Sequence, residues 1–168
     1  SGHMQIDIQD NDLVELIRES IGLLSPQMRE RKDKIVADVV DECLYVQCDR
    51  EKMRQILANL LNNAILHNQP GLEIRVGARR NKERVVVWIS DNGKGIPAGE
   101  QQRIFEPYYQ VRKSGEDCTK GTGLGLAIAR GLVEAHQNRL TLKSEAGRGT
   151  IFSFELDALP DRPPPILH

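Results

Sequence analysis

Residues 84–96 read RVVVWISDNGKGI, an apolar run that ends on a carboxylate and is followed by two glycines. The nearly continuous apolar run over residues 84–90 is typical of a central strand. Asp91 therefore stands at a strand end, beside glycines that let the backbone come close to a flat ring. A carboxylate in that place can accept a hydrogen bond from an exocyclic amine. An ordinary D-N-G turn is the alternative interpretation of the same residues.

A second glycine-rich segment, GTGLGL at residues 121–126, runs straight into an apolar helical pattern predicted over residues 124–136. Backbone N–H groups at such a helix start form an anion site, and glycine lets a phosphate approach closely. The spacing is not a Rossmann fingerprint, because no strand precedes it, and not a P-loop, because no G-K-[ST] follows. A long polar segment, residues 97–120, precedes it, and a loop of that length in a compact domain is usually functional.

A third element is the helix predicted to start at Asp49. Its apolar stripe consists of Met53, Ile56, Leu57, Leu60, Leu61 and Ala64. Asn59, Asn63 and His67 are spaced at i, i+4 and i+8, so they form one column that flanks this stripe. Amide oxygens in such a column could reach a bound Mg²⁺, which favours oxygen ligands together with phosphate oxygens. A solvated polar edge is the other interpretation, and Asn62 is expected to lie on the outer, solvated side.

The rest of the chain alternates between helix and strand patterns. A first helix is predicted from Leu13, capped by Asn11 or Asp12, and Pro26 should end or kink it. Strands are predicted over residues 34–40, 44–47, 72–79, 139–144 and 150–156, with a turn at residues 41–42 between the first two. The order of elements predicts an α+β fold, a two-layer α/β sandwich in which helices cover one face of a mixed sheet.

Composition narrows the functional classes. The chain has 168 residues, 39% of them apolar, and a net charge of −1, which suits one globular domain. The sequence has no lysine- or arginine-rich block, so nucleic acid is not expected as a partner. No apolar run approaches the roughly 18 residues of a membrane span, and no signal-peptide pattern starts the sequence. The three cysteines form no C-x-x-C pair, which favours idle thiols in a reducing cytoplasm.

Domain boundaries follow from the same composition. Residues 1–4 (SGHM) look like a cloning remnant. Residues 5–157 are predicted to form the single domain. Residues 158–168, which include the PDRPPP segment, are expected to form a flexible or extended proline-rich tail.

Five motifs occur in order: NLLNNA at 59–64, DNGKGI at 91–96, RIFEP at 103–107, GTGLGLAIA at 121–129 and GRGT at 147–150. This series closely resembles the catalytic ATP-binding domain of bacterial sensor histidine kinases. That domain belongs to the GHKL superfamily, with gyrase B, the mismatch-repair ATPases and certain heat-shock chaperones. The resemblance runs from about residue 12 to 156. It implies the Bergerat-type ATP-binding fold, ATP and Mg²⁺ as cofactors, and protein-histidine kinase activity.

The resemblance also implies a role for individual residues. Asn63 would be the Mg²⁺ ligand, and Asp91 would bind the exocyclic amine of adenine, with Thr150 near it. Phe105 matches an aromatic residue at the start of a lid, residues 105–120, whose glycine-rich end would contact phosphates. Asn59 and Asn63 are the expected catalytic residues. The full set expected at ATP is Asn59, Asn63, His67, Asp91, Gly93, Gly95, Ile96, Tyr109, Arg112, Lys120, Gly121, Thr122, Gly123, Leu124, Gly125, Leu126 and Thr150.

Three positions depart from the family pattern. Leu66 and His67 stand where the family often has Lys then Tyr, so one phosphate contact is lost, and His67 either replaces the aromatic or simply packs. Gln110 stands where arginine often follows the lid aromatics. Arg112, Lys113 and Lys120 could supply that charge or could be solvated lid charges. Tyr109 could stack on the base or pack the lid.

The residue type at position 59 bears on whether the domain transfers a phosphoryl group to a protein or hydrolyses ATP. Related hydrolases carry a glutamate four residues before the Mg²⁺ asparagine, and here that position is Asn59, whose amide is a poor general base. Transfer to a protein acceptor is therefore favoured over hydrolysis, and the resemblance implies that the acceptor is a histidine on a separate dimerisation domain, with a response regulator downstream. His3, His67, His136 and His168 all lack the H-E/D-x-x-x-P context. The isolated chain is expected to be monomeric and to bind Mg·ATP without phosphorylating itself. A hydrolytic ATPase and a non-catalytic nucleotide-binding or docking module are the alternatives.

Overall fold

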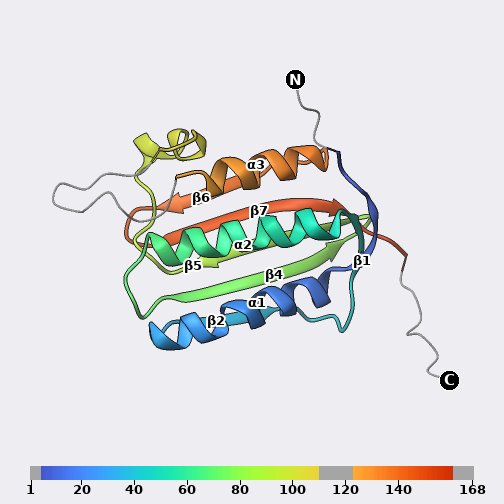
Figure 1. The fold of residues 1–168 in the computed structure, drawn as a ribbon, viewed down its shortest axis with the longest axis horizontal. Coiled ribbons are helices and arrows are strands. Elements are labelled where there is room, and N and C mark those ends of the chain that lie inside the picture. The colour runs from blue at the N-terminus through green and yellow to red at the C-terminus, as the bar shows by residue number, and fades with distance from the viewer. Residues whose placement is uncertain (1–4, 110–122, 161–168) are drawn as a thin grey trace.

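The computed structural model describes residues 5–109 and 123–160, which form two layers (Figure 1). The elements are β1 (Gln9–Asp12), α1 (Leu13–Glu30), β2 (Lys34–Asp38), β3 (Tyr45–Cys48), α2 (Arg50–Leu66), β4 (Glu73–Asn81), β5 (Arg84–Asp91), the 3-10 turns Ala98–Glu100 and Arg103–Phe105, α3 (Gly125–Ala135), β6 (Thr141–Glu145) and β7 (Gly149–Asp157). The larger sheet has the strand order β2-β4-β5-β7-β6. Only the β2–β4 pair is parallel. The three helices cover one face of this sheet, which confirms the predicted α+β sandwich.

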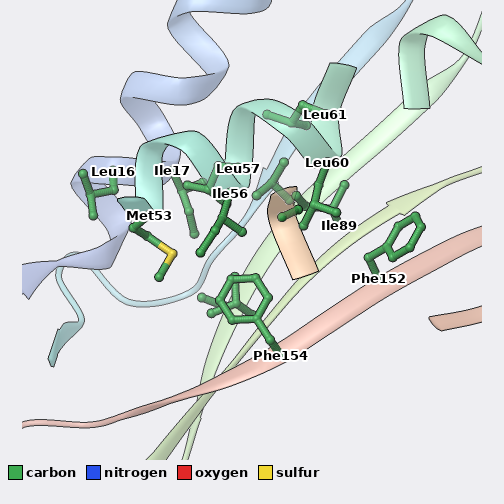
Figure 2. Packing of buried hydrophobic residues seen from close by; sticks show 14 of the residues in the cluster. Leu16, Ile17, Met53, Ile56, Leu57, Leu60, Leu61, Ile89, Phe152 and Phe154 are labelled. Carbon is green, nitrogen blue, oxygen red and sulfur yellow. The ribbon is translucent and has the colours of Figure 1, made fainter. Parts of the chain in front are cut away.

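The core lies between α2 and the central strands. All six residues of the predicted α2 stripe are buried, and Figure 2 shows Met53, Ile56 and Leu60 on the side of α2 toward Ile89 of β5 and Phe152 and Phe154 of β7. Burying a side chain of this size contributes about 1.5–3 kcal/mol relative to leaving it exposed. β5 alternates buried Val85, Val87 and Ile89 with partly exposed residues on the other face. The strand therefore fixes which side of the sheet receives the helices.

The helix starts are set by two aspartates. Asp12 caps α1 by accepting the N–H of Val14 at 3.1 Å, and Asp49 caps α2 by accepting the N–H of Lys52 at 3.1 Å. Each carboxylate thus satisfies one of the N–H groups that a helix leaves unpaired at its start. Both predicted helix starts are confirmed.

The prediction that Pro26 ends or kinks α1 does not hold for the helix end. α1 continues through Pro26 to Glu30. Met28, beyond the proline, is only 1% exposed, so the helix gains apolar burial by continuing. That burial outweighs the single helical hydrogen bond that a proline nitrogen cannot make.

The first two predicted strands exist but do not pair with each other. β2 ends at Asp38 and pairs in parallel with β4, while β3 pairs antiparallel with β1 in a separate two-stranded sheet. β1 reads QDND, too short and polar to stand out as a strand by periodicity. The Asp33 carboxylate, whose side chain is 0% exposed, accepts the N–H groups of Gly71 and Leu72 at 2.8 Å each. These bonds bring β2 to β4.

Two further expectations concern thiols and membrane spans. Burial raises the pKa of the Cys48 thiol to about 11, which keeps it protonated and unreactive at neutral pH. Cys43 is also a free thiol, and Cys118 lies outside the described residues. Among the described residues, no helix is both long and apolar enough to cross a membrane.

Candidate functional site

Three polar residues lie in one row at the end of the sheet where β5, β7 and β6 meet. Asp91 is paired with Thr150 across β5 and β7, and Thr150 is paired with Ser144 across β7 and β6. Thr150 is only 6% exposed and shares its face with the buried Phe152, so the row faces the helical layer. The structure therefore brings Asp91 and Thr150 together as predicted. It adds Ser144, which the sequence interpretation missed although the glycine-rich turn sets this register.

The Asp91 carboxylate is held by backbone N–H groups. Its Oδ1 accepts the N–H of Gly93 at 2.8 Å. Burial raises the pKa of Asp91, and the N–H groups of Gly93 and Thr150 oppose that rise. An ionised carboxylate has more lone pairs than these two bonds use, so it can also accept a hydrogen bond from a ligand.

The glycines of the DNGKG segment, residues 91–95, are required by its close packing. Gly95 has φ +71°, and an added Cβ would lie 2.0 Å from the Glu145 carbonyl oxygen. An added Cβ on Gly93 would lie 2.0 Å from Oδ1 of Asn68. The Lys94 carbonyl also accepts the N–H of Gly147 at 2.7 Å. This loop is fixed between the β6–β7 turn and the end of α2.

Asn68 ties the DNGKG loop to α2. Its Nδ2 donates to the Ala64 carbonyl at 2.8 Å, and its Oδ1 accepts the N–H of Lys94 at 2.9 Å. Arg31 donates to the carbonyls of Ile65 and of Asn68, the latter at 2.9 Å, placing a cation at the negative end of the α2 dipole. Neither Asn68 nor Arg31 was predicted, because their partners lie far away in the sequence and no local pattern marks them.

The predicted column on α2 is present. Asn59, Asn63 and His67 are half-buried beside the buried stripe, whereas Asn62 is exposed, as expected for a flanking column. Nδ2 of Asn59 is buried, and within the described residues it has no hydrogen-bond partner. His67 is the residue after the last turn of α2, and its N–H donates to the Asn63 carbonyl at 3.2 Å. Leu66, 38% exposed, lies on the outer side.

The start of α3 faces Asn59. An added Cβ on Gly125, the first residue of α3, would lie 3.9 Å from Oδ1 of Asn59. The residue at the N-cap, Leu124, provides no side-chain hydrogen bond to the first N–H groups of α3. Leu126 packs against the core. Gly123 has φ +72°, and its carbonyl accepts the N–H of Tyr108 at 2.9 Å.

The aromatic residues before the second glycine segment are packed. Phe105 meets Phe152 edge-on, with ring centroids 6.2 Å apart. The Tyr109 hydroxyl donates to Glu100 at 3.1 Å, and the Arg103 guanidinium lies 4.7 Å from the Tyr109 ring centroid. These contacts are the ones expected if Tyr109 packs against neighbouring residues and does not stack on the base.

Some of the residues singled out in the sequence belong to the segment 110–122. Gln110, Arg112, Lys113, Lys120, Gly121 and Thr122 lie outside the described residues. The other predicted positions belong to segments that meet at one end of the molecule. There the C-terminal end of α2, the ends of β5 and β6 and the starts of α3 and β7 meet, at the left in Figure 1. Ile96 belongs to the same end, with its N–H donating to Ser144 Oγ at 2.8 Å.

Residues 48–160 match the family described as histidine kinase-, DNA gyrase B-, and HSP90-like ATPase. The chain belongs to this family. Its sequence is 35% identical to the alginate biosynthesis sensor protein KinB of Pseudomonas aeruginosa, over 90% of the chain and 25% of KinB. It is 34% identical to the sensor histidine kinase WalK of Bacillus subtilis, over 76% of the chain and 21% of WalK. The chain thus spans about a quarter or less of these two relatives.

Solved structures show the same relationship. The catalytic domain of histidine kinase ThkA matches with a TM-score of 0.78 and 28% identity, over 92% of this chain and 99% of that domain. Full-length ShkA, solved in complex with AMPPNP, matches with a TM-score of 0.82 and 27% identity, over 96% of this chain and 34% of ShkA. The chain is therefore a catalytic ATP-binding domain of the sensor histidine kinase type.

Proposed function

We propose that this domain binds Mg·ATP and donates the γ-phosphoryl group to a histidine on a separate dimerisation domain, for transfer to a response regulator. The observation that carries the proposal is Asn59. Its amide nitrogen is buried without a described partner and its side chain faces the start of α3. A group so placed can donate to a phosphate oxygen, but it cannot act as the general base of a hydrolase.

The base would bind at the sheet end. The half-buried Asp91 carboxylate retains acceptor capacity after its bonds to backbone N–H groups, which suits the exocyclic amine of adenine. Gly93, Gly95 and Ile96 belong to the loop that shapes this edge. The fixed conformation of that loop means that little ordering is needed when a base binds.

The phosphates would bind between α2 and α3. The N–H groups at the start of α3 lack a side-chain cap, and the positive end of the helix dipole favours an anion there. Asn59 supplies a further donor. Gly123 and Gly125 leave room for the phosphate chain, and the undescribed Lys120, Gly121 and Thr122 are proposed to complete this end.

The residues present fit a magnesium ion held largely by phosphate. Asn63 lies one turn beyond Asn59 in the same half-buried column, and its amide oxygen is the proposed protein ligand. Among the described residues, no group of three or more His, Cys, Asp or Glu side chains could hold a metal by itself. Bound Mg²⁺ would offset the charge on the phosphate oxygens.

The acceptor histidine is proposed to lie outside this domain. His136 accepts the Asp49 N–H on Nε2 at 3.1 Å, and its Nδ1 is 2.8 Å from the Leu132 carbonyl. Both ring nitrogens are engaged, so neither is available as a nucleophile. ThkA has been solved in complex with the response regulator TrrA and matches this chain with a TM-score of 0.76 at 25% identity. That complex supports a response regulator as the downstream partner. The proposed location is the cytoplasm, where ATP is available.

The test combines this chain with a purified histidine-bearing dimerisation domain, Mg²⁺ and ATP labelled on the γ-phosphate. Acid-labile label on the partner is expected, with none on this chain alone. Asn63→Ala should reduce transfer by about 100-fold or more, as loss of a transition-state charge contact does. Asn62→Ala, exposed on the same helix, is the matched control. Phosphate release without a partner would instead indicate a hydrolase, and tight ATP binding without label would indicate a docking module.

A further inference from the structure

The Ser144 hydroxyl uses its whole hydrogen-bonding capacity. It lies 2.8 Å from the Ile96 nitrogen, 2.9 Å from the Gly149 carbonyl oxygen and 2.9 Å from Oγ1 of Thr150. A serine hydroxyl has one proton and two lone pairs. Three partners at these distances therefore leave no group of Ser144 unused.

This saturation fixes the direction of each bond. The Gly149 carbonyl can only accept, so it takes the Ser144 proton. The Ile96 N–H can only donate, so it occupies one Ser144 lone pair. The remaining lone pair must accept the Thr150 proton, because otherwise two hydroxyl oxygens would face each other at 2.9 Å with no proton between them.

Thr150 is thereby left with lone pairs only. In the adjacent strand its register partner is Asp91, whose carboxylate is also an acceptor when ionised. The Asp91–Thr150 row thus offers acceptors and no side-chain donor toward the helical layer. An exocyclic amine, which carries two N–H donors, complements such a row.

We propose that Ser144 is a specificity-determining residue: by holding the Thr150 proton, it makes this row select a purine with an amine over one with a carbonyl at the same position. The inference rests on the proposed ATP site and deepens it. Ser144 is a positioning residue that acts through Thr150. Without Ser144, the Thr150 hydroxyl is free to rotate and donate to a carbonyl oxygen, so one cause of discrimination is lost.

The experiment compares the affinities for ATP and for inosine triphosphate, whose base carries a carbonyl in place of the amine. Calorimetric titration of the wild-type domain with Mg²⁺ should show a preference for ATP. Ser144→Ala should reduce the ATP-to-ITP affinity ratio by about fivefold, the usual effect of one neutral hydrogen bond. Thr150→Val should also reduce the ratio, because it removes an acceptor that serves only the amine.

Thr141→Ala is the matched control. Thr141 forms a hydroxyl pair with Ser153 Oγ at 2.6 Å, on the same two strands but on the opposite, exposed face. This variant should keep the wild-type ratio. Equal losses for both nucleotides in Ser144→Ala and Thr150→Val would mean a purely structural role and would overturn the inference. If Ser144→Ala does not fold, Ser144→Cys replaces it, because a thiol of similar size is a weak donor and acceptor and should lower the ratio in the same direction. Absence of ATP binding in the wild type would instead sink the proposed site itself.

Discussion

The two halves of the candidate site are built differently. The base half is the DNGKG loop with Ile96, where the adenine base is proposed to bind. There the N–H of Gly93 donates to Asp91, that of Lys94 to Asn68 and that of Ile96 to Ser144. The phosphate half lies between α2 and the start of α3, where the phosphates are proposed to bind. There the Asn59 amide nitrogen is buried without a described partner, and the N-cap residue of α3 provides no side-chain cap. Within residues 5–109 and 123–160, the donors of the base half are satisfied and the phosphate half carries unused donors.

This difference matches what each half would have to recognise. A planar base is distinguished from its analogues by fixed acceptors, so the loop that presents them has to be ordered before the ligand arrives. A phosphate is a strong acceptor that can satisfy donors the protein leaves unpaired. Those unpaired donors lower the stability of the free domain, a common trade-off at functional sites. Substitutions in the two halves should therefore affect stability and binding in different proportions.

Asn68→Ala should have the largest effect on the stability of the free domain. It removes the bonds to Ala64 and Lys94, which should lower the unfolding free energy by about 1–2 kcal/mol. Urea unfolding followed by circular dichroism measures the change. Asn62→Ala, on the exposed face of α2, should change it by less than about 0.5 kcal/mol. Equal effects of the two substitutions would show that the hydrogen bonds of Asn68 to Ala64 and Lys94 contribute nothing to the stability of the domain.

Much of the fold and part of the site could be predicted because the signals are local. The α2 stripe, the cap at Asp49 and the strand ending at Asp91 each depend on residues within a few positions of one another. The nearness of Thr150 to Asp91 was implied by the family resemblance and not by any local signal. Local spacing was also sufficient for the column of Asn59 and Asn63, because a helix repeats every 3.6 residues.

The remaining features depend on contacts between distant segments. Asn68 meets Lys94, and Arg31 meets the end of α2; no local spacing encodes either contact. Ser144 reaches Asp91 only through the pairing of β7 with β5, two strands that are far apart in the sequence. The continuation of α1 past Pro26 depends on the burial of Met28, a tertiary contact that overrides local propensity. Long-range packing, rather than composition, decides these features.

Asp91→Asn should have a smaller effect on stability, in the opposite direction. Burial raises the pKa of Asp91 in the folded state, so its contribution to stability is complete below the unfolded pKa and is lost as pH rises through the folded pKa. At neutral pH the partly desolvated charge of Asp91 therefore lowers stability, and the amide should raise the melting temperature by up to about 3 °C. Thermal unfolding of both proteins at pH 7 measures this shift.

The same substitution should weaken ATP binding by about tenfold or more, because a charge-assisted hydrogen bond is lost. Wild-type affinity should fall as pH decreases through the raised pKa, since protonation removes the carboxylate, whereas the affinity of Asp91→Asn should show no such loss. Calorimetric titrations across that pH range provide the measurement. Unchanged affinity in Asp91→Asn would contradict the assignment of Asp91 to the base.

Asn59→Ala should have the smallest effect on the free domain, and it tests the phosphate half directly. Since Nδ2 of Asn59 is buried without a described partner, its loss removes no described hydrogen bond and should raise the unfolding free energy slightly, by up to about 0.5 kcal/mol. ATP affinity should nevertheless fall by about fivefold, because a donor to phosphate is removed. Asn68→Ala is the counterpart, an asparagine whose amide is bonded in the free protein. If Asn59→Ala destabilised the domain as much as Asn68→Ala, the phosphate half would be as satisfied without ligand as the base half, and the contrast between the halves would be wrong.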